Sequence, residues 1–303
     1  MVRWLWAGLL WPSLALGAGT QKGFDVQEGA NTWDFDMRWK DHGGTVREVA
    51  FSVPRDSVDA DRTERTWFPR REFNEYVVKA VRAYGRSLKG RVEVSAKIQD
   101  GGVAIGVSGP ADKAKSIMAR AEKVRDDAIA QWIADNDYFV RESGALSFDH
   151  AALVQVYADD LAPVAEALKE GTQGERDYIE KVLSFVQSIP YEAQKKNGGD
   201  PGYRRPLALL YRNRGDCDSK AVLFLGLVEA AYPELDEAVV YVPGHALTGV
   251  ATKPREGDRT FEAGGKTFVY AEPVGPAEHP LGTPDPKNKN AGKKGEVRVV
   301  PQG

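Results

Sequence analysis

The single cysteine of the chain, Cys217, stands where a turn changes into an unbroken apolar stretch. The turn contains Gly215 and Asp216, and the apolar stretch predicts a buried helix that begins at or next to the cysteine. Unpaired backbone N–H groups and the helix dipole at such a position favour a thiolate over a thiol. We therefore expect Cys217 to be a nucleophile, the alternative being a small buried residue of the core.

A thiol nucleophile needs a base that accepts its proton. Among the four histidines, His245 begins a predicted strand after a Val-Pro-Gly turn, where its side chain can project from a strand edge. The other three are expected to be solvated or locally hydrogen-bonded. His42 lies in a glycine-rich turn, His150 precedes a helix, and His279 lies in a proline-rich segment.

The base in turn needs a group that holds it in the right tautomer. Glu272 follows the predicted strand 266–271 and precedes Pro273. If the strands that carry His245 and Glu272 are neighbours, their side chains meet, and a helix packed on that sheet brings Cys217 to the same place. We expect no metal or cofactor, because no paired His or Cys residues have ligand spacing and no Gly-rich phosphate loop follows a strand; a calcium site on the carboxylates, without an EF-hand pattern, is the alternative left open.

Other elements follow from hydrophobic periodicity. Period-two alternation predicts strands, an apolar face recurring every three to four residues predicts helices, and Asp100-Gly101-Gly102 predicts a hairpin. A second hairpin is expected at Arg255–Asp258, and residues 275–294 read as irregular. The predicted strands are 32–39, 46–53, 92–98, 103–107, 238–242, 245–252, 266–271 and 296–300, and the predicted helices are 71–88, 110–140, 151–168, 175–189 and the one at Cys217.

The first residues are typical of a secretory signal peptide, with one positive charge, an apolar run and small residues at Ala15 and Gly17. Cleavage is expected after Gly17, and an uncleaved anchor is the alternative. The protein would then be secreted or periplasmic. A net charge of −3, with 42% hydrophobic and 28% charged residues, gives no case for nucleic-acid or membrane binding.

Three segments together resemble the transglutaminase-like (papain-related) superfamily of thiol enzymes. They are Arg214–Cys217 with Lys220-Ala221, then Gly244-His245-Ala246, then Tyr270–Pro273. In addition, the run Phe185–Tyr191 is similar to a helix of the family and to the Ile-x-Tyr sequence that ends this helix. The resemblance covers roughly residues 170–280.

This resemblance implies an α+β fold in which a helix-borne cysteine packs on an antiparallel sheet. We expect a signal peptide (1–17), an N-terminal α/β domain of unknown role (18–145) and a transglutaminase-like domain (146–303). The family implies Cys217 as nucleophile, His245 as base and acid, and Glu272 as the third member. Two departures from the family are a Glu where Asp is usual and Ser219 where an acidic residue is frequent.

The implied reaction is acyl transfer at peptide-type amide bonds through a thioester, by a protease, amidase or transglutaminase. The substrate would be a peptide, a protein or a cell-envelope polymer, selected by loops 194–205 and 253–265, and the backbone N–H of Cys217 is the one oxyanion donor we name. A different class remains open, namely an inactive domain of the same fold that binds such a polymer. A third possibility is an unrelated secreted protein with a structural cysteine.

Overall fold

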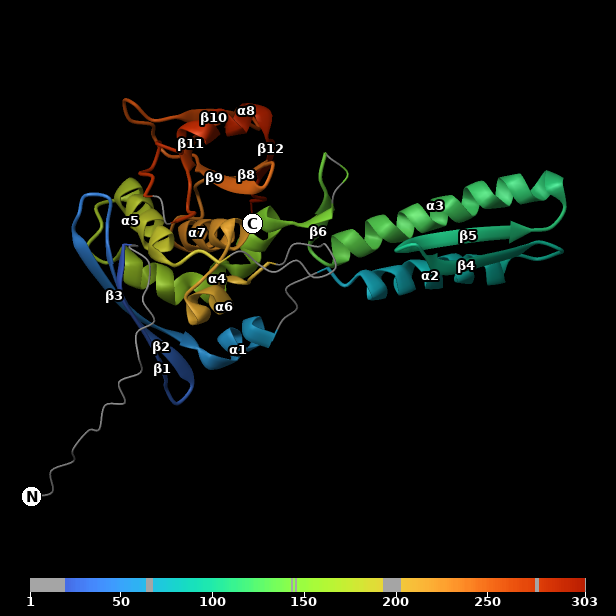
Figure 1. Cartoon of the computed structure of the whole chain (residues 1–303), viewed down its shortest axis with the longest axis horizontal. Helices are drawn as coiled ribbons and strands as arrows, with labels where there is room; N and C mark the ends of the chain where they lie inside the picture. Colours follow the sequence, from blue (N-terminus) through green and yellow to red (C-terminus); the bar gives the residue numbers. More distant parts are fainter. Residues whose placement is uncertain are drawn as a thin grey trace, which may run out of the picture.

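The computed structural model describes most of the chain and shows an α+β protein with antiparallel sheets (Figure 1). The predicted signal peptide lies outside the described residues. None of the described helices is long and apolar enough to cross a membrane. The described residues are 20–63, 68–142, 144, 146–192, 203–275 and 278–302.

The chain begins with a three-stranded antiparallel meander. Strands β1 (Gln21–Glu28), β2 (Thr32–Lys40) and β3 (Val46–Pro54) pair in order, and α1 (Arg55–Thr63) follows directly. From Phe35 in β2 and from Val49 in β3, every second side chain is buried, as the alternation predicts. Strand β1 is an addition to the predicted elements.

The next four elements form an arm that extends away from the rest of the protein (Figure 1). Asp100 and Gly101, which join its two strands, both have positive φ, as a tight hairpin turn requires. The helix predicted to run to residue 140 ends at Asp135, and Asp137 adopts a left-handed conformation that a helix cannot continue. The four elements are α2 (Arg70–Ser87), β4 (Glu93–Gln99), β5 (Gly102–Ser108) and α3 (Ala111–Asp135).

A layer of helices follows a short hairpin. Helix α7 is buried all round from Ser219 to Glu229, which explains its unbroken apolar sequence. It packs on α4 on one side and on β9 of the following sheet on the other. The elements are β6 (Tyr138–Val140), β7 (Leu146–Phe148), α4 (His150–Lys169), α5 (Glu175–Ser188), α6 (Pro206–Arg212) and α7 (Cys217–Ala231).

A five-stranded antiparallel sheet completes the fold, with strand order β10-β11-β9-β8-β12. The strands expected to be joined through Arg255–Asp258, β9 and β11, are antiparallel neighbours, and a turn forms there, with the Asp258 N–H donating to the Arg255 carbonyl at 3.1 Å. The unpredicted strand β10 follows this turn and joins β11 through a tight hairpin at Gly264-Gly265. Both glycines have positive φ, which a side chain would disfavour, so the turn forms there. The elements are β8 (Glu237–Val242), β9 (His245–Val250), β10 (Thr260–Ala263), β11 (Lys266–Ala271), the 3-10 turn η1 (Pro286–Asn288), α8 (Ala291–Lys294) and β12 (Glu296–Val299).

The main core is continuous across the predicted domain boundary at residue 145. Phe35, Trp39 and Phe51 of the first sheet belong to the same buried cluster as residues of α4, α5 and α7. The helices therefore lie between the two sheets (Figure 1). A separate small cluster, with Val78, Val81 and Ala96 at its centre, lies inside the arm. The division into domains at 145 stays a prediction.

Candidate functional site

Cys217 is the first residue of α7 and is half-buried. Asp216 caps the helix by accepting a hydrogen bond from the Ser219 N–H at 3.1 Å. Gly215 is required before it, because a Cβ there would lie 2.5 Å from a carbon of Leu209. The sequence therefore places the cysteine at the helix start, as predicted.

The Ile-x-Tyr segment lies beside this turn. Tyr191 forms a parallel bridge with Gly215, and the Gly215 N–H donates to the carbonyl of Pro190 at 3.2 Å. Burial raises the pKa of Tyr191, and the charges of Cys217, Asp216 and Asp218 raise it further. The C-terminal end of α5 is thus held against the cysteine turn.

The electrostatic surroundings of the thiol differ from the expected ones. Burial raises the pKa of Cys217 well above its usual value, and the charges of Asp218 and Asp216 raise it further. The sulfur donates to Asp218 Oδ1 at 3.4 Å, while the backbone N–H of Ala246 on β9 acts in the opposite direction. The lowered thiol pKa expected at the helix N-terminus is therefore not found, because burial and the charges of Asp218 and Asp216 raise it.

His245 and Glu272 meet as expected. Strands β9 and β11 are antiparallel neighbours with Ala271 opposite Thr248, so Glu272 leaves β11 at the end where β9 begins. His245 Nε2 lies 2.8 Å from Glu272 Oε1. The hydrogen bond assigns the proton to Nε2, because an ionised carboxylate accepts only, and Nδ1 of a neutral ring is then the free acceptor.

Glu272 is almost fully buried and still favours its ionised form. Burial alone would raise its pKa, but hydrogen bonds from His245 and from the Asp285 N–H, with the charges of His245 and His279, lower it. Its Oε1 also accepts from Asn288 Nδ2 at 2.8 Å, and its Oε2 accepts from the Asp285 N–H at 2.8 Å. The C-terminal segment, expected to be irregular, therefore supplies two donors that the sequence did not reveal.

Gln187 near the end of α5 ties this arrangement to the rest of the protein. Its side-chain amide donates to the carbonyls of Glu272 and His279, each at 2.9 Å. Its Oε1 lies 2.6 Å from His42 Nε2, so that nitrogen carries the proton. His42 was expected to be solvated or locally bonded, and its partner is instead 145 positions away along the chain.

His150 also departs from expectation. It is buried among Phe148, Tyr203 and Tyr241, and its Nδ1 lies 2.9 Å from the Tyr241 hydroxyl. Burial lowers the pKa of His150, and the charge of Asp218 acts in the opposite direction. It is thus a neutral core histidine near the same aspartate that contacts the thiol.

Lys220 is fully buried one turn into α7. Its ammonium donates to the carbonyl of Ile189 at the end of α5, and burial lowers the pKa of Lys220 to about 7. The lysine of the proposed motif therefore joins α7 to α5 and does not point to solvent.

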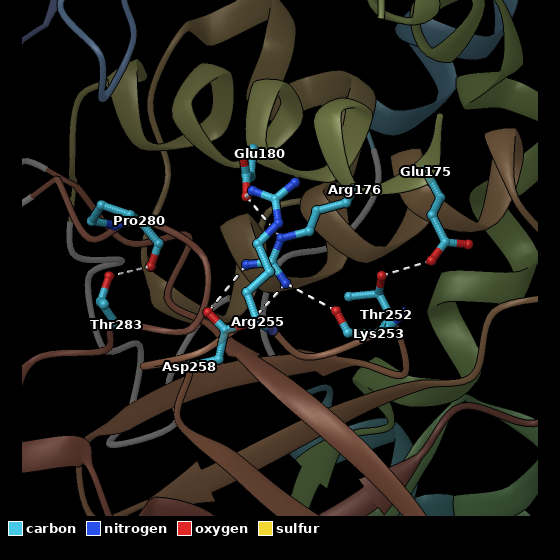
Figure 2. A network of polar contacts seen from close by, with 9 residues as sticks. All are labelled: Glu175, Arg176, Glu180, Thr252, Lys253, Arg255, Asp258, Pro280 and Thr283. Carbon is cyan, nitrogen blue, oxygen red and sulfur yellow. Dashed lines mark hydrogen bonds and ion pairs between the residues drawn. The ribbon is translucent and has the colours of Figure 1, made fainter. Parts of the chain in front are cut away.

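The loop predicted to select substrates after β9 is clamped to α5 (Figure 2). Arg176 donates to both oxygens of Asp258, at 2.8 and 3.1 Å, and to Glu180 at 2.9 Å. Thr252 donates to Glu175 at 2.7 Å. Both partners of the Arg176–Asp258 pair are mostly buried, so this loop has a defined position. Most of the other predicted loop, 194–205, lies outside the described residues.

Comparisons with protein-family models, with curated proteins and with solved structures found no match to this chain.

Proposed function

We propose that the protein is a secreted or periplasmic thiol enzyme of the transglutaminase-like type, which transfers acyl groups from amide bonds through Cys217, His245 and Glu272. The observation that carries the proposal is the 2.8 Å contact between His245 and Glu272 on neighbouring strands, with Cys217 on the helix that packs against β9. The order of these elements is that of the proposed fold family.

The raised pKa of Cys217 implies a resting state with a protonated thiol, and His245 is the base that we assign to it. Because the pKa of Cys217 is raised, the thiol proton leaves only as His245 Nδ1 accepts it during attack. The sulfur then bonds to the carbonyl carbon of the substrate, and the carbonyl electrons move to oxygen. The N–H of Cys217 is the donor we assign to that oxyanion.

The same imidazolium then returns its proton to the leaving amine as the C–N bond breaks, which leaves a thioester on Cys217. Water or a second amine attacks the thioester, and His245 accepts the proton of that nucleophile. The C–S bond then breaks, the acyl group leaves with the nucleophile, and His245 returns the proton to the Cys217 sulfur. Glu272 orients the ring and stabilises its positive charge throughout, with no change in its own protonation. The substrate is a peptide, a protein or a cell-envelope polymer.

The second candidate is an inactive domain of the same fold that binds such a polymer. The observation that favours it is the contact of the Cys217 sulfur with Asp218, which stabilises the thiol form. In that case the reactivity of the cysteine would not depend on His245.

Labelling of the single cysteine with iodoacetamide at pH 7 separates the two candidates. We expect labelling of the folded protein to depend on His245, which accepts the thiol proton as the sulfur attacks, so the rate should fall roughly 100-fold or more in His245→Ala, as for removal of a general base. Cys217→Ser defines the background, since the chain has one cysteine. Equal rates in the folded protein and in His245→Ala would contradict the enzyme proposal and favour the binding domain.

A further inference from the structure

The carboxylate of Glu272 is held by more than its histidine. Three donors converge on it, namely His245 Nε2 and Asn288 Nδ2 on Oε1, and the Asp285 N–H on Oε2, each at 2.8 Å. Glu272 and Asn288 are both buried. A buried side-chain amide that donates one N–H group to a buried carboxylate makes a strong, charge-assisted hydrogen bond.

The length of a glutamate explains why extra donors are needed. Compared with the aspartate usual at this position, it has one more rotatable bond, so its carboxylate needs more contacts to occupy one place. Here Gln187 fixes the backbone of Glu272 by donating to its carbonyl. Asn288 of η1 and the N–H of Asp285, the residue before η1, fix the carboxylate. Both ends of the side chain are therefore constrained.

We propose that Asn288, with the backbone N–H of Asp285, is the positioning element that allows a glutamate to orient His245, so that the segment 278–290 is part of the thiol site. The inference about the role in catalysis rests on the proposed function. The positioning of Glu272 itself does not, and it can be measured without any substrate.

The experiment compares Asn288→Leu with Asn290→Leu, two residues of the same type in the same segment. Asn288 is buried and Asn290 is exposed. The side-chain carboxyl of Glu272 is followed by carbon-13 NMR against pH in the full chain. In Asn288→Leu the pKa of Glu272 should rise, because the ionised form loses a donor while it stays buried. Asn290→Leu should leave the titration unchanged.

The same variants are tested for iodoacetamide labelling of Cys217 over a range of pH. We expect the acid limb of the rate profile to move to higher pH in Asn288→Leu, and the maximum rate to fall roughly tenfold through misplacement of the ring. A purely structural role would lower stability without moving the acid limb.

A measurement on the unmodified protein covers the case in which Asn288→Leu does not fold. The side-chain amide protons of Asn288 should shift with the same midpoint as the Glu272 carboxyl. Amide signals that do not follow Glu272, or a Glu272 titration unchanged in Asn288→Leu, would overturn the proposal. If instead Cys217 labels as fast in His245→Ala as in the unmodified protein, the enzyme proposal fails while the Glu272 titration still decides the role of Asn288.

Discussion

A glutamate is buried at each of the two ends of the five-stranded sheet, and the pKa values of the two carboxyl groups are shifted in opposite directions. Glu272 lies at the end where β9 begins, and Glu237 begins β8 at the other end, opposite Val250. Glu272 has three donors and a lowered pKa. Both oxygens of Glu237 are without a hydrogen-bond partner among the described residues, and burial first, then the charge of Glu229, raises its pKa well above the usual value.

The difference shows that hydrogen-bond donors, and not burial, decide the charge state of a buried glutamate carboxyl group in this protein. Both side chains are buried, and burial raises the pKa of each. Only at the His245 end do converging N–H groups outweigh that penalty. The end with the donors is the one that we propose for chemistry, whereas Glu237 is a protonated core residue.

The largest expected effect is that of Glu272→Leu on stability. The substitution leaves His245, Asn288 and the Asp285 N–H without their acceptor, so the free energy of unfolding should fall by about 3 kcal/mol. Urea denaturation at pH 7 measures it. A loss below about 0.5 kcal/mol, the range of ordinary surface substitutions, would mean that the donors at this end do not stabilise the carboxylate.

The matched change at the other end, Glu237→Leu, should act through pH. The folded protein holds the proton of Glu237 where the unfolded chain releases it, so wild-type stability should fall as the pH rises above the unfolded pKa. The variant should lack this fall, and its stability relative to wild type should increase by about 3 kcal/mol between pH 4.5 and 7. Urea denaturation at both pH values gives the slope. Parallel pH dependences in the two proteins would show that Glu237 is ionised in the fold.

A smaller effect is expected from a substitution that separates the contributions of burial and of a neighbouring charge to the pKa of Cys217. Asp218→Asn removes one negative charge and keeps the size of the side chain, so the pKa of Cys217 should fall while the thiol stays buried. The labelling rate at pH 7 should rise about threefold for each unit of that fall, because a less basic thiolate is also a weaker nucleophile. An unchanged rate would show that Asp218 does not contribute and would leave burial and Asp216 as the causes of the raised pKa.

Most elements were predictable because their signals are local. The alternation of β2 and β3, the amphipathic faces of α4 and α5, and the apolar run of α7 each follow from a side-chain period within one segment. The end of α3 was missed, since a left-handed residue such as Asp137 is only weakly marked in the sequence. The short strands β6, β7 and β10 were missed because a few residues give no clear period.

For the candidate site, the sequence alone determined the residue types and their elements: a cysteine at a helix start, a histidine at a strand start and a glutamate at a strand end. Their convergence depends on β9 and β11 being neighbours, which only the tertiary structure decided. It also decided the charge states, because a pKa depends on groups that are distant in the chain. Hydrogen bonds from His245 and the Asp285 N–H lower the pKa of Glu272, and burial against β9, followed by the charges of Asp218 and Asp216, raises the pKa of Cys217.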